Sequence, residues 1–188
     1  EENAYISSGS SAGIGMRLNY DATNRSVFVL EAFEDAPALG AGIDRGTEIL
    51  AIGDTPSSLR SVTSLFAAGG AATVADAFGP STAGLARTMT IRANGVEREV
   101  TVTKRDYTLA PVSSRYGYKI INDNGRRVGY INLRTFIGPA NDQLRTAFDA
   151  MRTQGITELI IDFRYNGGGL VSTAAVMGDL LGGNSSSC

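Results

Sequence analysis

The chain has 188 residues, of which 43% are hydrophobic and 19% charged, a composition typical of a globular protein rather than a disordered one. Its net charge of −2, without any run of Lys or Arg, gives no reason to expect nucleic-acid binding. No apolar stretch approaches the roughly 18–20 residues of a membrane span, and a single cysteine, Cys188, excludes a disulfide within the chain.

The N-terminal segment 1–12 has neither a basic region nor an apolar region and is therefore not a signal peptide. Strands are predicted next over 13–20, 25–33 and 48–52. In the first of them, alternation predicts one apolar face, made of Ile14, Met16, Leu18 and Tyr20.

Two helices are predicted between these strands and a hairpin. The first begins at Ser57 or Ser58, which can cap it, and ends at Gly69-Gly70. Its apolar face is expected to comprise Leu59, Val62, Leu65 and Phe66. A second short helix is predicted over 71–78. Two strands over 87–105 follow, and the Asn94-Gly95 pair between them is a strong hairpin signal.

A linker without periodicity, 106–117, separates this half from a different pattern. A hairpin is predicted around Asn124-Gly125, and an amphipathic helix follows over 138–155. The buried stripe of that helix is expected to be Leu144, Ala147, Phe148 and Met151. The strand 156–163 is so continuously apolar that we expect both faces of its sheet to be covered. A last helix is predicted from 170.

The short motif Gly-Ile-Gly-Met, Gly13 to Met16, stands at the entry to the first strand. Such a loop can point successive N–H groups at one spot and bind a terminal carboxylate, while the strand after it accepts an added peptide strand. The alternative is a plain turn at the start of a strand.

In its context the motif resembles the PDZ domain, most of all the bacterial type found within proteases. The resemblance covers roughly 12–105 and includes "APALGAGIDRGTEILAIGD" and "FGPSTAG". It implies a small β-barrel with helices that binds the C-terminal segments of proteins or peptides. The predicted contacts are the N–H groups of the loop and an apolar pocket, listed together as Gly13, Ile14, Gly15, Met16, Leu18, Leu59, Val62, Leu65 and Phe66. The extra helical segment before 71–78 leaves open which helix forms the wall of the groove.

The stretch "LIIDFRYNGGGLV" is the second motif, preceded by "VGYINLRTF" and the helix 138–155. In this order, after a PDZ-like unit, it resembles the S41 peptidases, the carboxyl-terminal processing and tricorn-like proteases. The resemblance implies an α/β core of the ClpP/crotonase type. It also implies that a backbone N–H of the glycine run, from Gly167 or Gly168, stabilises an oxyanion.

Around that run, Asp162 and Arg164 are expected to lie on opposite sides of the strand and to hold the turn through buried polar contacts. Asn166 is expected to cap or bend it. The alternative is a tight β-to-α connection without catalytic meaning. Phosphate binding is disfavoured because the run lacks both the G-x-G-x-x-G spacing and a Gly-Lys-Ser/Thr ending.

No nucleophile with an activating base is evident in this chain. There is no histidine, which removes Ser–His–Asp and Cys–His catalysis and most zinc sites. The two lysines, Lys104 and Lys119, do not match the family's catalytic lysine, and Ser185, Ser186, Ser187 and Cys188 form a polar tail. We therefore expect an inactive fragment that ends before the nucleophile.

The predicted organisation is an extension (1–12), an α+β PDZ-like domain (13–106) and an incomplete α/β peptidase domain (107–188). The predicted function is a serine endopeptidase of the carboxyl-terminal processing type, which captures substrate C-termini for proteolysis. No metal or organic cofactor is expected. The resemblance implies an extracytoplasmic location, in the bacterial periplasm or anchored by lipid. The alternative is a PDZ-containing scaffold without catalysis; the oligomeric state is left open.

Overall fold

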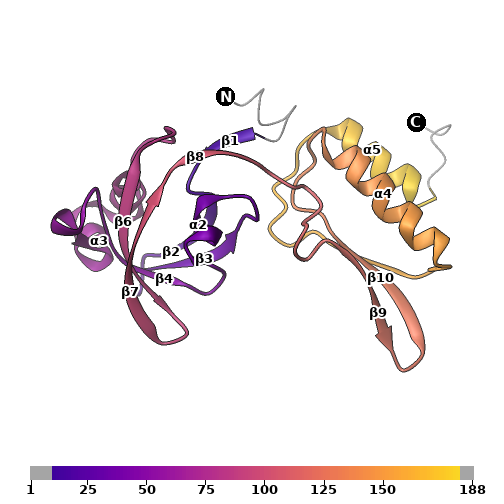
Figure 1. The fold of residues 1–188 in the computed structure, drawn as a ribbon, viewed down its shortest axis with the longest axis horizontal. Helices are drawn as coiled ribbons and strands as arrows, with labels where there is room; N and C mark the ends of the chain where they lie inside the picture. Colours follow the sequence, from indigo (N-terminus) through magenta and orange to yellow (C-terminus); the bar gives the residue numbers. More distant parts are fainter. Residues whose placement is uncertain (1–9, 183–188) are drawn as a thin grey trace. The chain divides into compact units, whose positions relative to one another are not determined.

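A computed structural model describes residues 10–182, so the predictions made for 1–9 and for Ser185–Cys188 lie outside the described residues. The chain divides into two compact units, with Ala12–Tyr107 in one and the chain from Thr108 onward in the other. Figure 1 shows both, and each is described by itself below. None of the described helices is long and apolar enough to cross a membrane.

The first unit is built on a six-stranded antiparallel sheet with the order β2-β3-β4-β6-β7, and β5 pairs with β4. Its strands are β2 (Met16–Asp21), β3 (Ser26–Ala32), β4 (Glu48–Gly53), β5 (Arg60–Ser61), β6 (Ala86–Ala93) and β7 (Val96–Thr103). A separate pair joins β1 (Ser10–Gly13) to β8 (Arg105–Thr108). In the six-stranded sheet β2 stands at an edge, so one side of it carries no neighbouring strand within the described residues.

Helices complete the core of this unit. The short α2 (Pro37–Gly40) precedes β4, and the long α3 (Val62–Ala77) packs against β3, β4 and β5. The backbone of α3 is non-helical at Gly69 and Gly70, so the predicted break between two helices is confirmed. The sheet and both helices bury one apolar cluster, which includes Val27, Ile49, Leu65, Val74 and Ile91.

The predicted start of the first helix was wrong. α3 begins at Val62, because Ser61 is its N-cap and accepts a hydrogen bond from the Ser64 N–H at 3.1 Å. Pro56–Ser58 instead forms the 3-10 helix η1, and Leu59 follows it. Leu59 therefore does not belong to the helical face on which it was placed.

Lys104 fastens the C-terminal end of α3. Its side chain is only 2% exposed, and its Nζ donates to the carbonyl oxygens of Phe78, Gly79 and Pro80 at 2.5, 3.1 and 2.6 Å. Phe78 is the C-cap of α3, and Gly79 and Pro80 directly follow it. Burial, and next the nearby charge of Arg87, lowers the pKa of the Lys104 ammonium.

The second unit has a three-stranded sheet covered by two helices. The sheet order is β11-β10-β9, with β10 antiparallel to β9 and parallel to β11. Its elements are β9 (Tyr118–Asp123), β10 (Arg126–Asn132), α4 (Ala140–Thr153), β11 (Leu159–Asp162) and α5 (Val171–Leu180). α4 and α5 pack side by side (Figure 1) and share one apolar cluster with β10.

Three local predictions are confirmed. Asn94-Gly95 and Asn124-Gly125 both have positive φ angles and connect antiparallel strands, as a two-residue hairpin requires. The predicted stripe of α4 is buried: Leu144 and Ala147 are 0% exposed, Met151 2% and Phe148 5%.

The prediction that both faces of the sheet around β11 are covered was wrong for the described residues. β11 lies at the edge, and Ile160 is 48% exposed. α4 and α5 bury the side of the sheet that carries Ile131 and Ile161. Because strand side chains alternate, Ile160 faces away from these helices.

Replacing the buried lysine tests how the end of α3 is held. Lys104→Met would leave buried carbonyls without donors, so we expect a loss of about 2 kcal/mol of unfolding free energy. The measurement is a urea titration followed by NMR signals of residues 12–107. Arg60→Met, an exposed cation of the same unit, is the control and should change the value by less than about 0.5 kcal/mol. Equal effects of the two would contradict the role of Lys104.

Candidate functional site

The glycine run forms the connection between β11 and α5. The chain turns here, and the φ angles of Tyr165, Gly168 and Gly169 are positive. Gly167, Gly168 and Gly169 are all exposed. The run thus presents backbone at the carboxyl end of a parallel strand, where ligand and active sites of α/β sheets commonly lie.

Asp162 is the polar centre beneath this turn, and it is 9% exposed. Its carboxylate accepts hydrogen bonds from the Tyr130 hydroxyl at 2.6 Å, from the Arg164 N–H at 2.9 Å and from the Arg164 guanidinium at 2.6 Å. Its carbonyl oxygen accepts from the Leu133 N–H at 3.0 Å. One residue therefore ties the end of β11 to β10 and to the first residues of the turn.

The expectation that Asp162 and Arg164 lie on opposite sides of the strand was wrong. β11 ends at Asp162, so Arg164 already lies in the turn, where its side chain folds back onto the carboxylate. Residues two apart share a side even within a strand. The expected holding role agrees with the contacts described above.

The Asn166 side chain bridges the turn to β10. Its Nδ2 donates to the Leu133 carbonyl at 2.9 Å, and its Oδ1 accepts from the Gly168 N–H at 2.8 Å. Within the described residues the Gly167 N–H donates no hydrogen bond. The two predicted oxyanion donors therefore differ, because the Gly168 N–H is already engaged inside the turn.

Any residue other than glycine at position 169 would force neighbouring backbone atoms to move. A Cβ atom there would lie 2.2 Å from the Phe136 carbonyl oxygen. The close approach lets the Phe136 N–H donate to the Gly168 carbonyl at 2.9 Å, while the Phe136 carbonyl accepts from the Leu170 N–H. These bonds fix the turn against the chain that follows β10.

The electrostatics of Asp162 follow from its contacts. The Arg164 guanidinium, aided by the Tyr130 hydroxyl and the Arg164 N–H, holds the pKa of the Asp162 carboxyl well below its usual range despite burial. Burial, together with the adjacent carboxylate, raises the pKa of Tyr130. The pair is therefore ionised at Asp162 and neutral at Tyr130 at physiological pH. Sequence reasoning missed this role of Tyr130. The register pairs Asn132 with Asp162, and Tyr130, two residues before Asn132, lies on the same face of the sheet as Asp162.

The loop before β2 is the second candidate site. Gly13, Ile14 and Gly15 are buried, yet no described residue accepts a hydrogen bond from the N–H of Ile14 or of Gly15. The carbonyls point the other way: Ile14 accepts from the Ala38 N–H at 2.9 Å and Gly15 from the Phe33 N–H at 3.0 Å. N–H groups without an acceptor in the protein are available to a ligand or a water molecule.

Gly15 gives this loop its shape. Its φ is +77°, and a Cβ there would lie 2.0 Å from the Ala36 Cβ atom. Only glycine satisfies both conditions without strain. Ala36 precedes α2, so the helix start and the loop are packed directly together.

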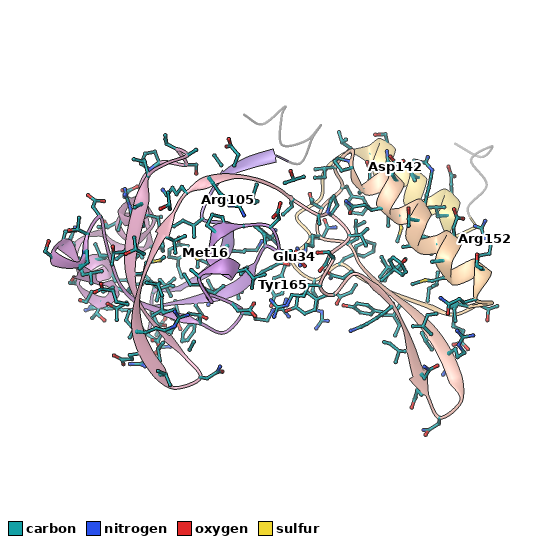
Figure 2. All side chains as sticks on the ribbon, viewed as in Figure 1. Met16, Glu34, Arg105, Asp142, Arg152 and Tyr165 are labelled. Atoms are coloured by element: carbon teal, nitrogen blue, oxygen red, sulfur yellow. The ribbon has the colours of Figure 1, made fainter. Side chains whose placement is uncertain are left out.

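The strand after the loop has an open edge. Because antiparallel pairs alternate and Gly15 bonds Phe33, Met16 forms a non-hydrogen-bonded pair with Ala32, and its backbone groups face the edge. Met16 and Leu18 are half-buried against the core. Figure 2 labels Met16 at the start of β2 and Arg105 on β8.

The predicted pocket residues on the helix lie mostly in the unit's own core. Val62 is 3% exposed, Leu65 0% and Phe66 7%. The segment after α3 lies near the loop, since Ser81 Oγ lies 3.9 Å from a Cβ built on Gly13. The structure thus brings Gly13, Ile14, Gly15, Met16 and Leu18 together and separates Leu59 from the helix.

The two lysines have the following surroundings. Lys104 is held by three carbonyls in the first unit, and Lys119 lies with its Nζ 5.2 Å from the centre of the Tyr130 ring. Among residues 10–182, no group of three or more Asp, Glu, His or Cys residues could hold a metal ion.

Because the Asp162 carboxylate is ionised, we predict how the stability of the protein depends on pH. Its folded pKa is lower than the unfolded value of about 3.9, so the unfolded state binds more protons in acid. Its stabilising contribution is present above about pH 4 and is lost as the pH falls toward the folded pKa. Arg164→Ala should raise the Asp162 pKa, measured by NMR of its carboxyl carbon, and speed amide exchange at Gly168. Arg152→Ala, an exposed arginine on α4, is the control; an unchanged Asp162 pKa in Arg164→Ala would contradict this.

Comparisons with known proteins agree on one family. Residues 127–186 match the family model "Peptidase family S41". The carboxyl-terminal-processing protease of Synechocystis sp. is 26% identical over 165 residues, covering 87% of this chain and 36% of that protein. The chloroplastic carboxyl-terminal-processing peptidase 2 of Arabidopsis thaliana is 28% identical, covering 86% and 30%. The chain thus spans about a third of the length of these relatives.

Two solved structures share the fold. A photosystem II D1 C-terminal processing protease superimposes with a TM-score of 0.60 at 22% identity, covering 94% of this chain and 46% of that one. A putative S41 protease from Bacteroides fragilis gives a TM-score of 0.56 at 24% identity, covering 88% and 43%. The predicted α/β fold of the S41 type is supported at this level. Together with the turn at Asp162–Gly169, these matches make the chain a relative of the S41 peptidases, the family that includes the carboxyl-terminal-processing proteases.

Proposed function

We propose that this chain carries the substrate-capture unit and part of the catalytic unit of a serine peptidase of the carboxyl-terminal processing type. The first unit, Ala12–Tyr107, acts as a PDZ-like domain that binds the C-terminus of a protein or peptide. The observation that carries the proposal is that no described residue accepts a hydrogen bond from the N–H of Ile14 or of Gly15, two buried residues beside the edge strand β2.

A peptide carboxylate supplies the hydrogen-bond acceptors that the N–H groups of this loop lack. Its two oxygens accept from the N–H groups of Ile14, Gly15 and Met16, and such charge-assisted bonds are stronger than neutral ones. The residues before the carboxylate extend along β2 as an added antiparallel strand, using the backbone groups that Met16 presents to the edge. The loop needs no rearrangement, since its carbonyls are already tied to Phe33 and Ala38.

The groove for the terminal side chain lies between β2 and the second half of α3. Met16 and Leu18 from the strand and Ala77 from the helix are half-buried against one core. The buried side chains of Val62, Leu65 and Phe66 belong to the same core. The kink at Gly69-Gly70 lets the second half of α3 run in a direction different from the first half.

In the second unit, the glycine turn contributes backbone N–H groups to an oxyanion site. Gly167 has an N–H without an acceptor among the described residues, whereas Gly168 donates to Asn166. We assign Gly167 as the ready donor; Gly168 joins when a substrate oxyanion displaces the Asn166 amide. A fixed donor of this kind stabilises a tetrahedral oxyanion without reorganisation of solvent.

Because the capture unit and the catalytic unit belong to one chain, a substrate bound to the first is present at a raised local concentration for the second. The serine nucleophile and its base are not assigned to any residue of this chain, because neither lysine matches the catalytic lysine of the family it resembles and the sequence has no histidine. We place the intact protein outside the cytoplasm, on the strength of its relatives, which include chloroplastic processing peptidases. A scaffold that binds C-termini without catalysis is the alternative.

Blocking the ligand's carboxylate tests the capture unit. A ten-residue peptide that ends in a free Val-Val should bind at least about tenfold more tightly than its amidated twin, because amidation removes the charge held by the loop. Isothermal titration calorimetry measures both affinities. Equal binding of the twins, or no binding of either, would refute carboxylate capture.

Enlarging Gly15 tests the loop itself. Gly15→Ala forces a contact with Ala36 and an unfavourable φ angle, so affinity for the free peptide should fall about tenfold. Gly40→Ala is the matched control, because Gly40 has open space and no positive φ angle. If the Gly15 and Gly40 variants bind alike while both remain folded by circular dichroism, the loop is not the site.

The chain alone should not cleave an unfolded protein such as casein, since a serine without an activating base is a poor nucleophile. Gel electrophoresis after prolonged incubation measures this. Cleavage that disappears when one residue of this chain is replaced would overturn the assignment of the catalytic pair to other parts of the protein.

A further inference from the structure

Ser81 lies against the loop before β2, in the segment that follows α3. A Cβ atom built on Gly13 would lie 3.9 Å from Ser81 Oγ and 4.0 Å from the Gly15 nitrogen. Apart from the residues next to Gly13 in the chain, no other described atom lies within 4 Å of that position. These are ordinary van der Waals distances, so the space beside Gly13 can take an atom of a ligand. A hydroxyl group and a backbone N–H both lie next to that space.

The segment that carries Ser81 is held in place by Lys104. The Lys104 ammonium donates to the carbonyl of Pro80, the residue before Ser81, at 2.6 Å. The Lys104 carbonyl accepts from the Gly84 N–H at 2.8 Å, and the Lys104 N–H donates to the Leu85 carbonyl at 2.8 Å. The segment is therefore fixed on both sides of Ser81, and its backbone is in position before a ligand arrives.

The charge beside this segment favours an anion. Lys104 is 2% exposed, its ammonium donates to carbonyl groups, and it has no ion pair among residues 10–182. Arg87, the other cation near it, is paired with Asp54 at 2.9 Å. Lys104 directly precedes β8, which pairs with β1, and β1 ends at Gly13. A buried charge without a counter-ion is costly, so an anion bound beside Gly13 would reduce that cost.

We infer that the Ser81 hydroxyl donates a hydrogen bond to the C-terminal carboxylate of the bound peptide. This role rests on the proposed capture of C-termini, because the same carboxylate binds the loop. One of its oxygens accepts from the Gly15 N–H and the other from the Ser81 hydroxyl, each at an ordinary length of about 2.8 Å. Among residues 10–182 the Ser81 hydroxyl has no other hydrogen-bond partner. A side chain outside the loop thus completes the set of donors.

The neighbouring hydroxyl, that of Thr82, does not share this position. No atom of Thr82 lies within 4 Å of the Cβ position on Gly13, although Thr82 directly follows Ser81 and is exposed like it. The Thr82 N–H donates to the Pro80 carbonyl at 2.9 Å, a backbone bond that does not need its side chain. The two adjacent hydroxyls therefore form a matched pair for substitution.

The test uses the ten-residue peptide with a free Val-Val end and its amidated twin. Ser81→Ala should weaken binding of the free peptide about fivefold, because a hydrogen bond to a charged acceptor is lost. The affinity for the amidated peptide should change by less than about twofold, because its end carries no charge. Ser81→Thr keeps a hydroxyl at this position and should bind the free peptide within about twofold of the unaltered chain. Titrations into the ¹⁵N-labelled chains measure the affinities and show that each variant is folded.

Thr82→Ala is the control and should leave both affinities unchanged. The role of Ser81 is overturned if Ser81→Ala binds the free peptide as tightly as the unaltered chain, or if it weakens both peptides equally. It is also overturned if Thr82→Ala or Ser81→Thr loses as much affinity as Ser81→Ala. These outcomes leave the capture of C-termini standing, because the unaltered chain still prefers the free peptide. If the unaltered chain binds the twins alike, the capture itself is refuted, and the role of Ser81 falls with it.

Discussion

A backbone N–H that is withdrawn from water needs an acceptor, and this requirement organises the first unit around its loop. At Ile14 and Gly15 the carbonyls are bound inside the protein while the N–H groups are not. That polarity is set by Gly15, whose conformation turns the peptide planes and whose missing side chain lets Ala36 pack against the loop. The edge strand β2 directly follows these donors.

The glycine turn of the second unit solves a different problem. It is exposed, so its free N–H at Gly167 meets water, and its value lies in being fixed in place. Asp162 fixes the start of the turn through Tyr130 and Arg164, and Asn166 and Phe136 fix its middle. Rigidity of this kind would suit the oxyanion site proposed above, because donors that must reorganise lose their advantage over water.

Local signals in the sequence predicted much of the fold because their causes are local. The Asn-Gly pairs adopt positive φ angles in any context, and the apolar stripe of α4 depends on the period of a helix. Leu59 was misplaced because capping by Ser61 overrides the apolar spacing. The exposure of Ile160 depends on which elements cover the sheet, which the strand's own residues do not report.

In the candidate sites, too, some features follow from local sequence and others from contacts between distant segments. The glycines in Gly13–Gly15 and Gly167–Gly169 indicate backbone conformations that other residues rarely adopt. The positions of the two candidate sites were therefore predictable from the sequence. The role of Tyr130 depends on a contact between two strands, with Asp162 32 residues further along the chain, and the engagement of the Gly168 N–H by Asn166 depends on the exact backbone of the turn. Neither alternation nor helical period carries such information.

The most direct measurement of the central claim is the amide proton shift of Ile14 and Gly15 in the ¹⁵N-labelled chain. Both protons should move downfield when a peptide with a free C-terminus is added, because they form charge-assisted hydrogen bonds, and should stay in place with the amidated peptide. Unmoved Ile14 and Gly15 signals in the presence of a bound free peptide would contradict the account.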